Sequence, residues 1–257
     1  MKGKNEKAIE LLKTVIRKQR IGEKQMNGDA TEGMKLKEVE NLGIAYVTVF
    51  NRTCEKYTWW TPVEYLYELC LNNTKRKEFY DKKAAELGIT YEHLAVVMCG
   101  RALRALPSFI REYQLANALH RKFPSATFCQ DEYTDKYFHC DVKMEMNEQT
   151  YFFWSFIASE KSVRNFVQKF SDSRFGHVND GIHVLCPFDR RDNVKSGELK
   201  VKANYLGWHL YSREYLDVIE NMVNSGEHKE YSELFANGSV CRLEMYHEPM
   251  VVYKNAA

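Results

Sequence analysis

The spacing of polar and apolar residues stops being helical in three neighbouring segments near the middle of the chain, and these segments predict three β-strands. The segments are ATFCQDEY (126–133), KYFHCDVKMEM (136–146) and TYFFWSFIAS (150–159). Asn147, Glu148 and Gln149 separate the second segment from the third and are typical of a turn. We therefore expect the second and third strands to form a hairpin.

The second segment has two different faces. Cys140, Val142, Met144 and Met146 make one apolar face, which suits a core. The opposite face has polar residues at alternate positions, namely Asp141, Lys143 and Glu145. This face is a candidate for chemistry, and the alternative is that it is simply the solvated face of an amphipathic strand.

Helical periodicity surrounds these strands. Residues 107–124 predict a helix bracketed by Pro107 and Pro124, with Ser108 as its N-cap. Residues 159–173 predict a second helix, and 181–188 a short buried strand. The remaining predictions are a strand (199–211), a helix capped by Ser212 (212–226), a last helix (228–238) and one or two strands (239–253).

The N-terminal part of the chain is different, because residues 61–106 look largely helical. Residues 4–20 predict a helix with a basic face, and glycine-containing residues 21–33 predict a loop. Residues 41–53 suit either a strand or a buried helix. The expected fold class is α+β or α/β, with a mixed-sheet core after the helical region. The expected domains are 1–106, of which 1–35 is partly flexible, and 107–257.

Composition adds few limits to this picture. Of 257 residues, 44% are hydrophobic and 13% aromatic, which is enough for a sizeable core. The net charge of +2 gives no global argument for nucleic acid, so such an argument rests on local clusters. Seven cysteines without a CxxC pair suggest a reducing compartment. With no signal-peptide pattern and no long apolar run, we expect a cytoplasmic protein without a membrane partner.

The predicted order from residue 108 to residue 188 is helix, three strands, helix, strand. This order resembles the common core of the PD-(D/E)xK, or restriction-endonuclease-like, superfamily, over roughly a third of the chain. The resemblance implies Mg²⁺-dependent cleavage of phosphodiesters. Carboxylates would hold the metal against a phosphate, and a Lys would help it to polarise the attacking water.

Two registers map the residues onto this resemblance. In the first, Glu112 matches the acid of the first helix and Asp141 the acid of the second strand. The acid-x-Lys element of the third strand then falls on Trp154, Ser155 and Phe156. None of these side chains binds Mg²⁺ well, so the site is degenerate in this register.

In the second register, Asp131 or Asp135 is the first acid and residues 141–143 are the acid-x-Lys element. The candidate catalytic residues are Asp141, Lys143 and Glu112. The candidate Mg²⁺ ligands are Asp141, Asp131 and Glu112. The sequence leaves both registers open.

A basic segment follows the predicted strand at 181–188. Its candidate phosphate contacts are Arg190, Arg191, Lys195, Lys200 and Lys202. The alternative is a charged surface loop, because acidic residues are interleaved with the basic ones.

The sequence predicts a nuclease-like protein that cleaves nucleic acid if the site is intact and otherwise binds without cleaving. The alternative is a non-enzymatic phage or mobile-element protein that binds and inhibits a host defence complex. A protein partner and a homo-oligomer are both compatible with the aromatic clusters.

Overall fold

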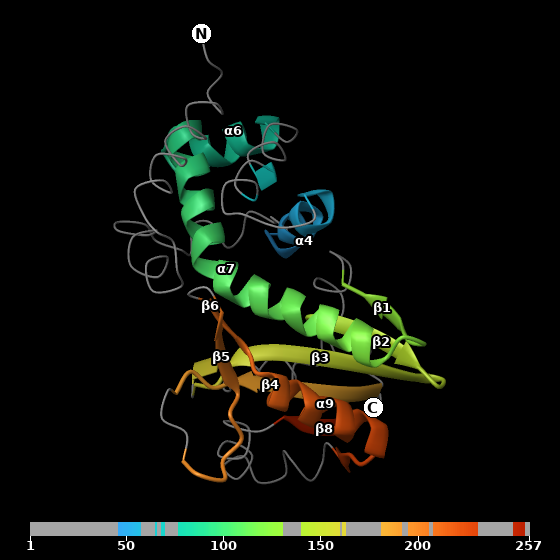
Figure 1. Cartoon of the computed structure of the whole chain (residues 1–257). Helices are drawn as coiled ribbons and strands as arrows, with labels where there is room; N and C mark the ends of the chain where they lie inside the picture. The colour runs from blue at the N-terminus through green and yellow to red at the C-terminus, as the bar shows by residue number, and fades with distance from the viewer. Residues whose placement is uncertain are drawn as a thin grey trace. The chain divides into compact units, whose positions relative to one another are not determined.

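The computed structural model describes residues 46–57, 65, 68–69, 77–130, 140–159, 161–162, 181–191, 195–205, 208–230 and 249–254. Its helices are α4 (Tyr46–Tyr57), α6 (Lys77–Glu86), α7 (Tyr91–Lys122) and α9 (Arg213–Ser225) (Figure 1). Its strands are β1 (Thr127–Cys129), β2 (Val142–Met146), β3 (Gln149–Ile157), β4 (Gly181–Phe188), β5 (Lys202–Tyr205), β6 (Trp208–Tyr211), β7 (Lys229–Glu230) and β8 (Met250–Lys254). The fold is α+β, with a helix-rich N-terminal region followed by a mixed sheet, as predicted.

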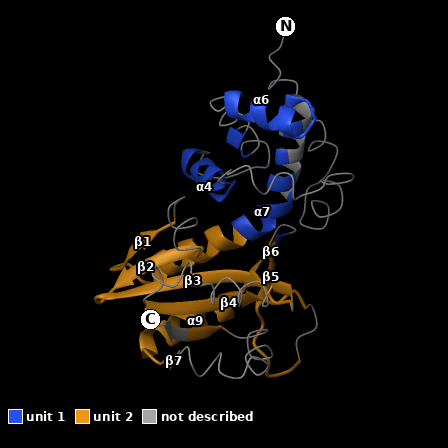
Figure 2. Ribbon diagram, turned by 180° about the vertical axis from the view of Figure 1, so that it is seen from behind, with its two compact units in different colours: residues 1–109, 206–208 blue, residues 110–205, 209–257 orange. Residues whose placement is uncertain are grey.

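The chain divides into two compact units (Figure 2). Unit 1 contains residues 1–109 and 206–208, and unit 2 contains residues 110–205 and 209–257. In unit 1, Tyr80 and Ala84 of α6 pack with Tyr91, Leu94 and Met98 of α7. No helix in the described parts of the chain is long and apolar enough to cross a membrane.

The main sheet of unit 2 has the strand order β1–β2–β3–β4–β8–β7. The first three strands form an antiparallel meander, whereas β4 runs parallel to β3. Such a parallel pair needs a crossover connection, and residues 158–180 provide it. Of these, Lys161 and Ser162 are helical, and residues 160 and 163–180 lie outside the described part. Strand β8 is antiparallel to β4.

The β2–β3 hairpin follows from its two-residue turn. Asn147 and Glu148 have positive φ angles of 51° and 63°, as in the type I′ turns that match the twist of paired strands. Gln149 already belongs to β3 and pairs with Met146, so the turn is one residue shorter than expected. This register places Lys143 opposite Phe152 and Val142 opposite Phe153.

One face of the sheet packs against two helices. The apolar side chains of β2, β3 and β4, among them Val142, Phe153 and Val184, form a single buried cluster with Leu119 of α7 and Ile219 of α9. Alternation along each strand directs these side chains to the same face. The prediction of a core face on the second strand is therefore correct, since Cys140, Val142 and Met144 are buried.

Helix α9 begins where the sequence predicts. Ser212 is extended at the N-cap and its hydroxyl accepts a hydrogen bond from the backbone N–H of Tyr215 at 3.1 Å. Gly226 ends the helix in the left-handed conformation with a φ of 68°. Its buried residues Tyr215, Leu216, Ile219 and Val223 lie on one face.

Three local expectations differ from the structure. Helix α7 continues through Pro107, so Ser108 lies inside the helix and is not an N-cap. The single strand expected at 199–211 is the pair β5 and β6, which form a separate two-stranded sheet. The last helix expected at 228–238 is wrong at its start, because Lys229 and Glu230 form β7. Residues 231–238, and the helix and loop expected at 4–33, lie outside the described residues.

Candidate functional site

Asp141 lies directly before β2, at the point where this strand separates from β3. Its N–H donates to the Phe153 carbonyl at 2.9 Å, the last step of the backbone ladder. The β2–β3 pairing ends at Val142 and Phe153, but β3 continues to Ile157. The next backbone N–H of β3 on the β2 side is that of Ser155, and no residue of β2 lies opposite it. The Asp141 carboxylate accepts a hydrogen bond from this N–H. Asp141 thus takes the place of a backbone carbonyl at the end of β2.

The Ser155 side chain belongs to a chain of hydrogen bonds on the core side of the sheet. The Tyr211 hydroxyl donates to the Cys186 carbonyl at 2.8 Å. Because this bond uses the phenolic proton, the Ser155 hydroxyl donates to the Tyr211 oxygen, at 2.7 Å. The Tyr211 ring stacks on Tyr215 with a centroid distance of 5.1 Å.

The pKa values of two groups in this cluster are raised by burial. Burial, and to a lesser extent the charge of Asp141, raise the pKa of the Cys186 thiol well above 9.0. Burial, Cys186 and Asp141 raise the pKa of Tyr211 well above 10.0, although Ser155 and Arg111 act to lower it. Both groups therefore stay protonated at neutral pH, and a protonated thiol is a weak nucleophile.

Arg111 of α7 lies in the same region of unit 2. Its side chain is 1% exposed, and the guanidinium carbon is 4.6 Å from the centre of the Phe188 ring. One guanidinium nitrogen donates to the His209 carbonyl at 3.5 Å. Arg111 and Asp141 act on the pKa of Tyr211 in opposite directions, so both lie within electrostatic reach of its hydroxyl.

The other two polar residues of the second strand pair with each other. The Lys143 ammonium donates to the Glu145 carboxylate at 2.6 Å, and the Glu145 side chain is 53% exposed. An ion pair this open to solvent contributes little to stability. Glu112 is half-buried on α7, and Asp131 and Asp135 lie outside the described residues.

The third strand carries packing side chains where the first register expects acid-x-Lys. The Trp154 indole N–H donates to His183 Nδ1 at 3.0 Å, and both side chains are buried. His183 also stacks on Phe152 with a centroid distance of 5.1 Å. These residues lie on the sheet face opposite the α7–α9 cluster, because they alternate with Phe153 and Val184.

The described residues do not fit a Mg²⁺ site. Magnesium is held by several oxygen ligands in near-octahedral geometry, whereas Asp141 uses one carboxylate oxygen for the Ser155 N–H. Within the described ranges, no three Asp, Glu, His or Cys side chains form a group that could hold a metal ion.

The five basic candidates after β4 have different environments. Lys202 is buried, and its ammonium donates to the Arg190 carbonyl at 2.8 Å. Arg191 pairs with Asp189 at 2.6 Å. The cation of Arg191 is exposed but paired, and Arg190, Lys195 and Lys200 are also exposed.

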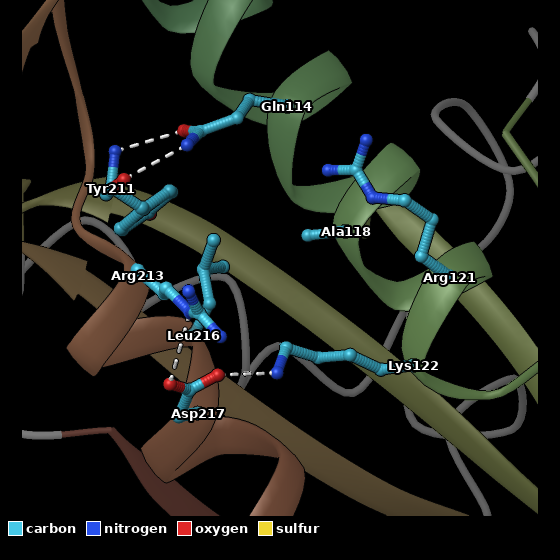
Figure 3. Close-up of a pocket in the computed structure, with 8 residues that line it drawn as sticks. All are labelled: Gln114, Ala118, Arg121, Lys122, Tyr211, Arg213, Leu216 and Asp217. Carbon is cyan, nitrogen blue, oxygen red and sulfur yellow. Dashed lines mark hydrogen bonds and ion pairs between the residues drawn. The ribbon is translucent and has the colours of Figure 1, made fainter.

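A pocket of about 360 Å³ lies between α7 and α9 in unit 2 (Figure 3). Its lining is Gln114, Ala118, Arg121, Lys122, Tyr211, Arg213, Leu216 and Asp217. Sequence reasoning missed this pocket, because its two helices are far apart along the chain. The only sequence signals were the basic end of the first helix and the arginine that follows the Ser212 cap.

Lys122 connects the two helices. Its ammonium donates to Asp217 at 2.6 Å and also forms an ion pair with Glu220. Desolvation acts to lower the pKa of Lys122, but the hydrogen bonds to Asp217 and Glu220 outweigh it and raise the pKa above 10.5. The hydrogen bond from Lys122 lowers the pKa of Asp217 below 3.8.

This pairing predicts a pH-dependent contribution of Asp217 to stability. A lowered carboxyl pKa stabilises the fold above the ordinary value of 3.8, and the contribution disappears as the pH falls through the folded-state pKa. Asp217→Asn should therefore lower the thermal midpoint slightly at pH 7, and the difference from wild type should shrink below pH 4. Calorimetry from pH 7 to pH 2.5 measures it. Glu227→Gln, an exposed change next to α9, should show no such trend, and a difference for Asp217→Asn that stays constant with pH would contradict the pairing.

No protein-family model matches the chain, and no curated protein or solved structure matches it.

Proposed function

We propose that unit 2 is a nuclease-like core that binds nucleic acid without cleaving it. The order of elements supports the resemblance, since α7 is followed by the antiparallel strands β1, β2 and β3 and then by the parallel strand β4. Asp141 directly precedes the second of these strands, which favours the first register over the second. In that register the third strand presents Trp154, Ser155 and Phe156.

The single observation that carries the proposal is the bond between Asp141 and Ser155. The acid expected to hold the metal instead accepts the backbone N–H of the strand that should supply the acid-x-Lys element. The Ser155 hydroxyl is bound to Tyr211, and the Trp154 indole is bound to His183. Each of these contacts is structural, and none provides a base, a metal ligand or a water-polarising amine.

Exposed cations support nucleic acid as the ligand. Arg190, Lys195 and Lys200 are exposed in the segment after β4. The Ser212 N–H donates to the Val201 carbonyl at 2.7 Å, so this segment is joined to the start of α9, where Arg213 is also exposed. Clustered Lys and Arg residues bind phosphates without reading the sequence, and their affinity falls steeply with salt.

The experiment measures both binding and cleavage. Fluorescence anisotropy with labelled single-stranded DNA, duplex DNA and RNA should show binding that weakens as salt rises, with or without Mg²⁺. Gel analysis of the same samples, with Mg²⁺ or Mn²⁺ present, should show no cleavage. The triple variant Arg190→Gln, Lys195→Gln, Lys200→Gln should bind at least tenfold more weakly and reduce the salt slope, by about 0.9 per lost contact to duplex DNA.

The matched control removes three charges from unit 1. Lys77→Gln, Lys82→Gln and Lys83→Gln lie on α6, so this triple variant should bind nearly as well as wild type. An equal loss in both triple variants would mean that binding follows net charge and not this surface. Metal-dependent cleavage that is lost in Asp141→Ala, or no binding to any of the nucleic acids at low salt, would overturn the proposal.

A further inference from the structure

The pocket between α7 and α9 has an uneven charge. Its lining carries the cations of Arg121, Lys122 and Arg213 but only one carboxylate, that of Asp217. All of these residues belong to unit 2. Asp217 and Glu220 together offset Lys122, so the remaining positive charge is that of Arg121 and Arg213, which favours an anionic ligand.

Lys122 is already occupied, whereas the two arginines are available. The Lys122 ammonium is held by Asp217 and Glu220. Arg213 is 95% exposed and only 3.9 Å from Asp217, which is the limit of an ion pair. Arg121 is exposed and makes no hydrogen bond or ion pair with any other described residue. Figure 3 shows Arg121 extending from α7 and Arg213 from α9, so that both helices contribute a guanidinium.

The rest of the lining is partly apolar. Both polar atoms of the Gln114 amide are bound to the backbone of Tyr211, donating to its carbonyl and accepting from its N–H, each at 2.8 Å. These two hydrogen bonds hold α7 against β6 and occupy both polar atoms of the Gln114 amide, which leaves this side chain no role in ligand binding. Ala118, Leu216 and Tyr211 add apolar surface to the lining.

From these features we propose that the pocket binds a phosphomonoester, with Arg121 and Arg213 contacting the phosphate. A terminal phosphate has three free oxygens and suits two planar guanidinium forks, which bind such oxygens in pairs. A volume of about 360 Å³ is at the small end of ligand pockets. It admits a small molecule or the end of a strand, whereas the phosphodiesters of a duplex stay on an open surface. The apolar lining would contact the group that carries the phosphate.

This inference does not depend on nucleic-acid binding by the segment after β4. The phosphate has two sources, a free mononucleotide or the end of an oligonucleotide, and the experiment separates them. Isothermal titration of the full chain uses inorganic phosphate, adenosine 5′-monophosphate and adenosine. A short oligonucleotide with and without a 5′-phosphate is the second arm.

The monophosphate should bind and adenosine should not. Arg121→Gln and Arg213→Gln should each weaken monophosphate binding about tenfold, which is the effect of losing one charge-assisted contact. Asp217→Asn should strengthen binding severalfold, because it removes the only carboxylate of the lining. Lys82→Gln on α6 is the charge-matched control and should bind like wild type. A preference for the 5′-phosphorylated oligonucleotide over the monophosphate would identify a strand end as the source, and the reverse would identify a mononucleotide.

The arginine variants should weaken binding, whereas the aspartate variant should strengthen it. Because all three residues are on the surface of the same two helices, a general loss of folding would weaken binding in all three variants, and only an effect of charge gives opposite changes. The inference is overturned if neither phosphate nor the monophosphate binds at millimolar concentration, or if both arginine variants bind like wild type. In that case the proposed function still stands if nucleic acid binds through Arg190, Lys195 and Lys200. Conversely, if the monophosphate binds but no nucleic acid does, the proposed phosphate pocket is supported and the proposed function is refuted.

Discussion

Replacing Asp141 with Ala should lower the free energy of unfolding by about 1–3 kcal/mol, which is the cost of leaving a buried or half-buried donor without its acceptor. The Ser155 N–H loses the carboxylate that replaces a backbone carbonyl at the end of β2. Asp141→Asn should cost less, because its side-chain oxygen can still accept the same hydrogen bond. Urea unfolding of the three proteins measures the differences.

Glu145→Ala is the matched control, because Glu145 lies on β2, four residues after Asp141, and its exposed carboxylate pairs with Lys143. It should change the free energy of unfolding by at most about 0.5 kcal/mol. Unfolding with and without Mg²⁺ completes the experiment. If Asp141→Ala is more stable than wild type and abolishes a Mg²⁺-dependent stabilisation, Asp141 is a metal ligand and its structural role is wrong.

Phe153→Ala should have the largest effect on stability, about 3–5 kcal/mol, as expected for removing a large aromatic side chain from a packed core. Phe153 is fully buried in the central strand β3 and pairs with Val142 on one side and Val184 on the other. Its cluster also contains residues of α7 and α9. The cavity would therefore lie where both helices meet the sheet, and thermal or urea unfolding would detect its cost.

Phe79→Ala provides the comparison on the surface. Phe79 of α6 is 42% exposed, so its loss should cost about 1 kcal/mol or less. A Phe153→Ala variant as stable as Phe79→Ala would show that this face of the sheet is not packed against the helices.

Much of the fold of unit 2 is encoded in local patterns. The alternation at Cys140, Val142 and Met144 identifies the core face of β2, and the Ser212 cap identifies the start of α9. Pro107 misleads because proline ordinarily breaks a helix. Here α7 continues through Pro107 with Leu106 and Ile110 buried near it, although proline cannot donate the usual backbone hydrogen bond.

The chemistry of the candidate site was less accessible from sequence. The partner of Asp141 is a backbone N–H fourteen residues away, and an exposed acid, a metal ligand and a strand cap look alike in one sequence. The pocket depends on Arg121 and Arg213, which only the packing of two distant helices brings to one lining. Neither feature has a periodicity or a spacing that could have indicated it.

The position of β8 in the sheet affects how the protein is made. Strand β4 sits between β3 and β8, yet β8 leaves the ribosome roughly sixty residues after β4. Until then, the hydrogen-bonding groups along one side of β4 have no neighbouring strand, and its apolar residues are an attractive template for other nascent chains. Slow translation between the two strands, or a shortage of chaperones, should therefore reduce the yield of folded protein more than it affects the stability of molecules that have already folded.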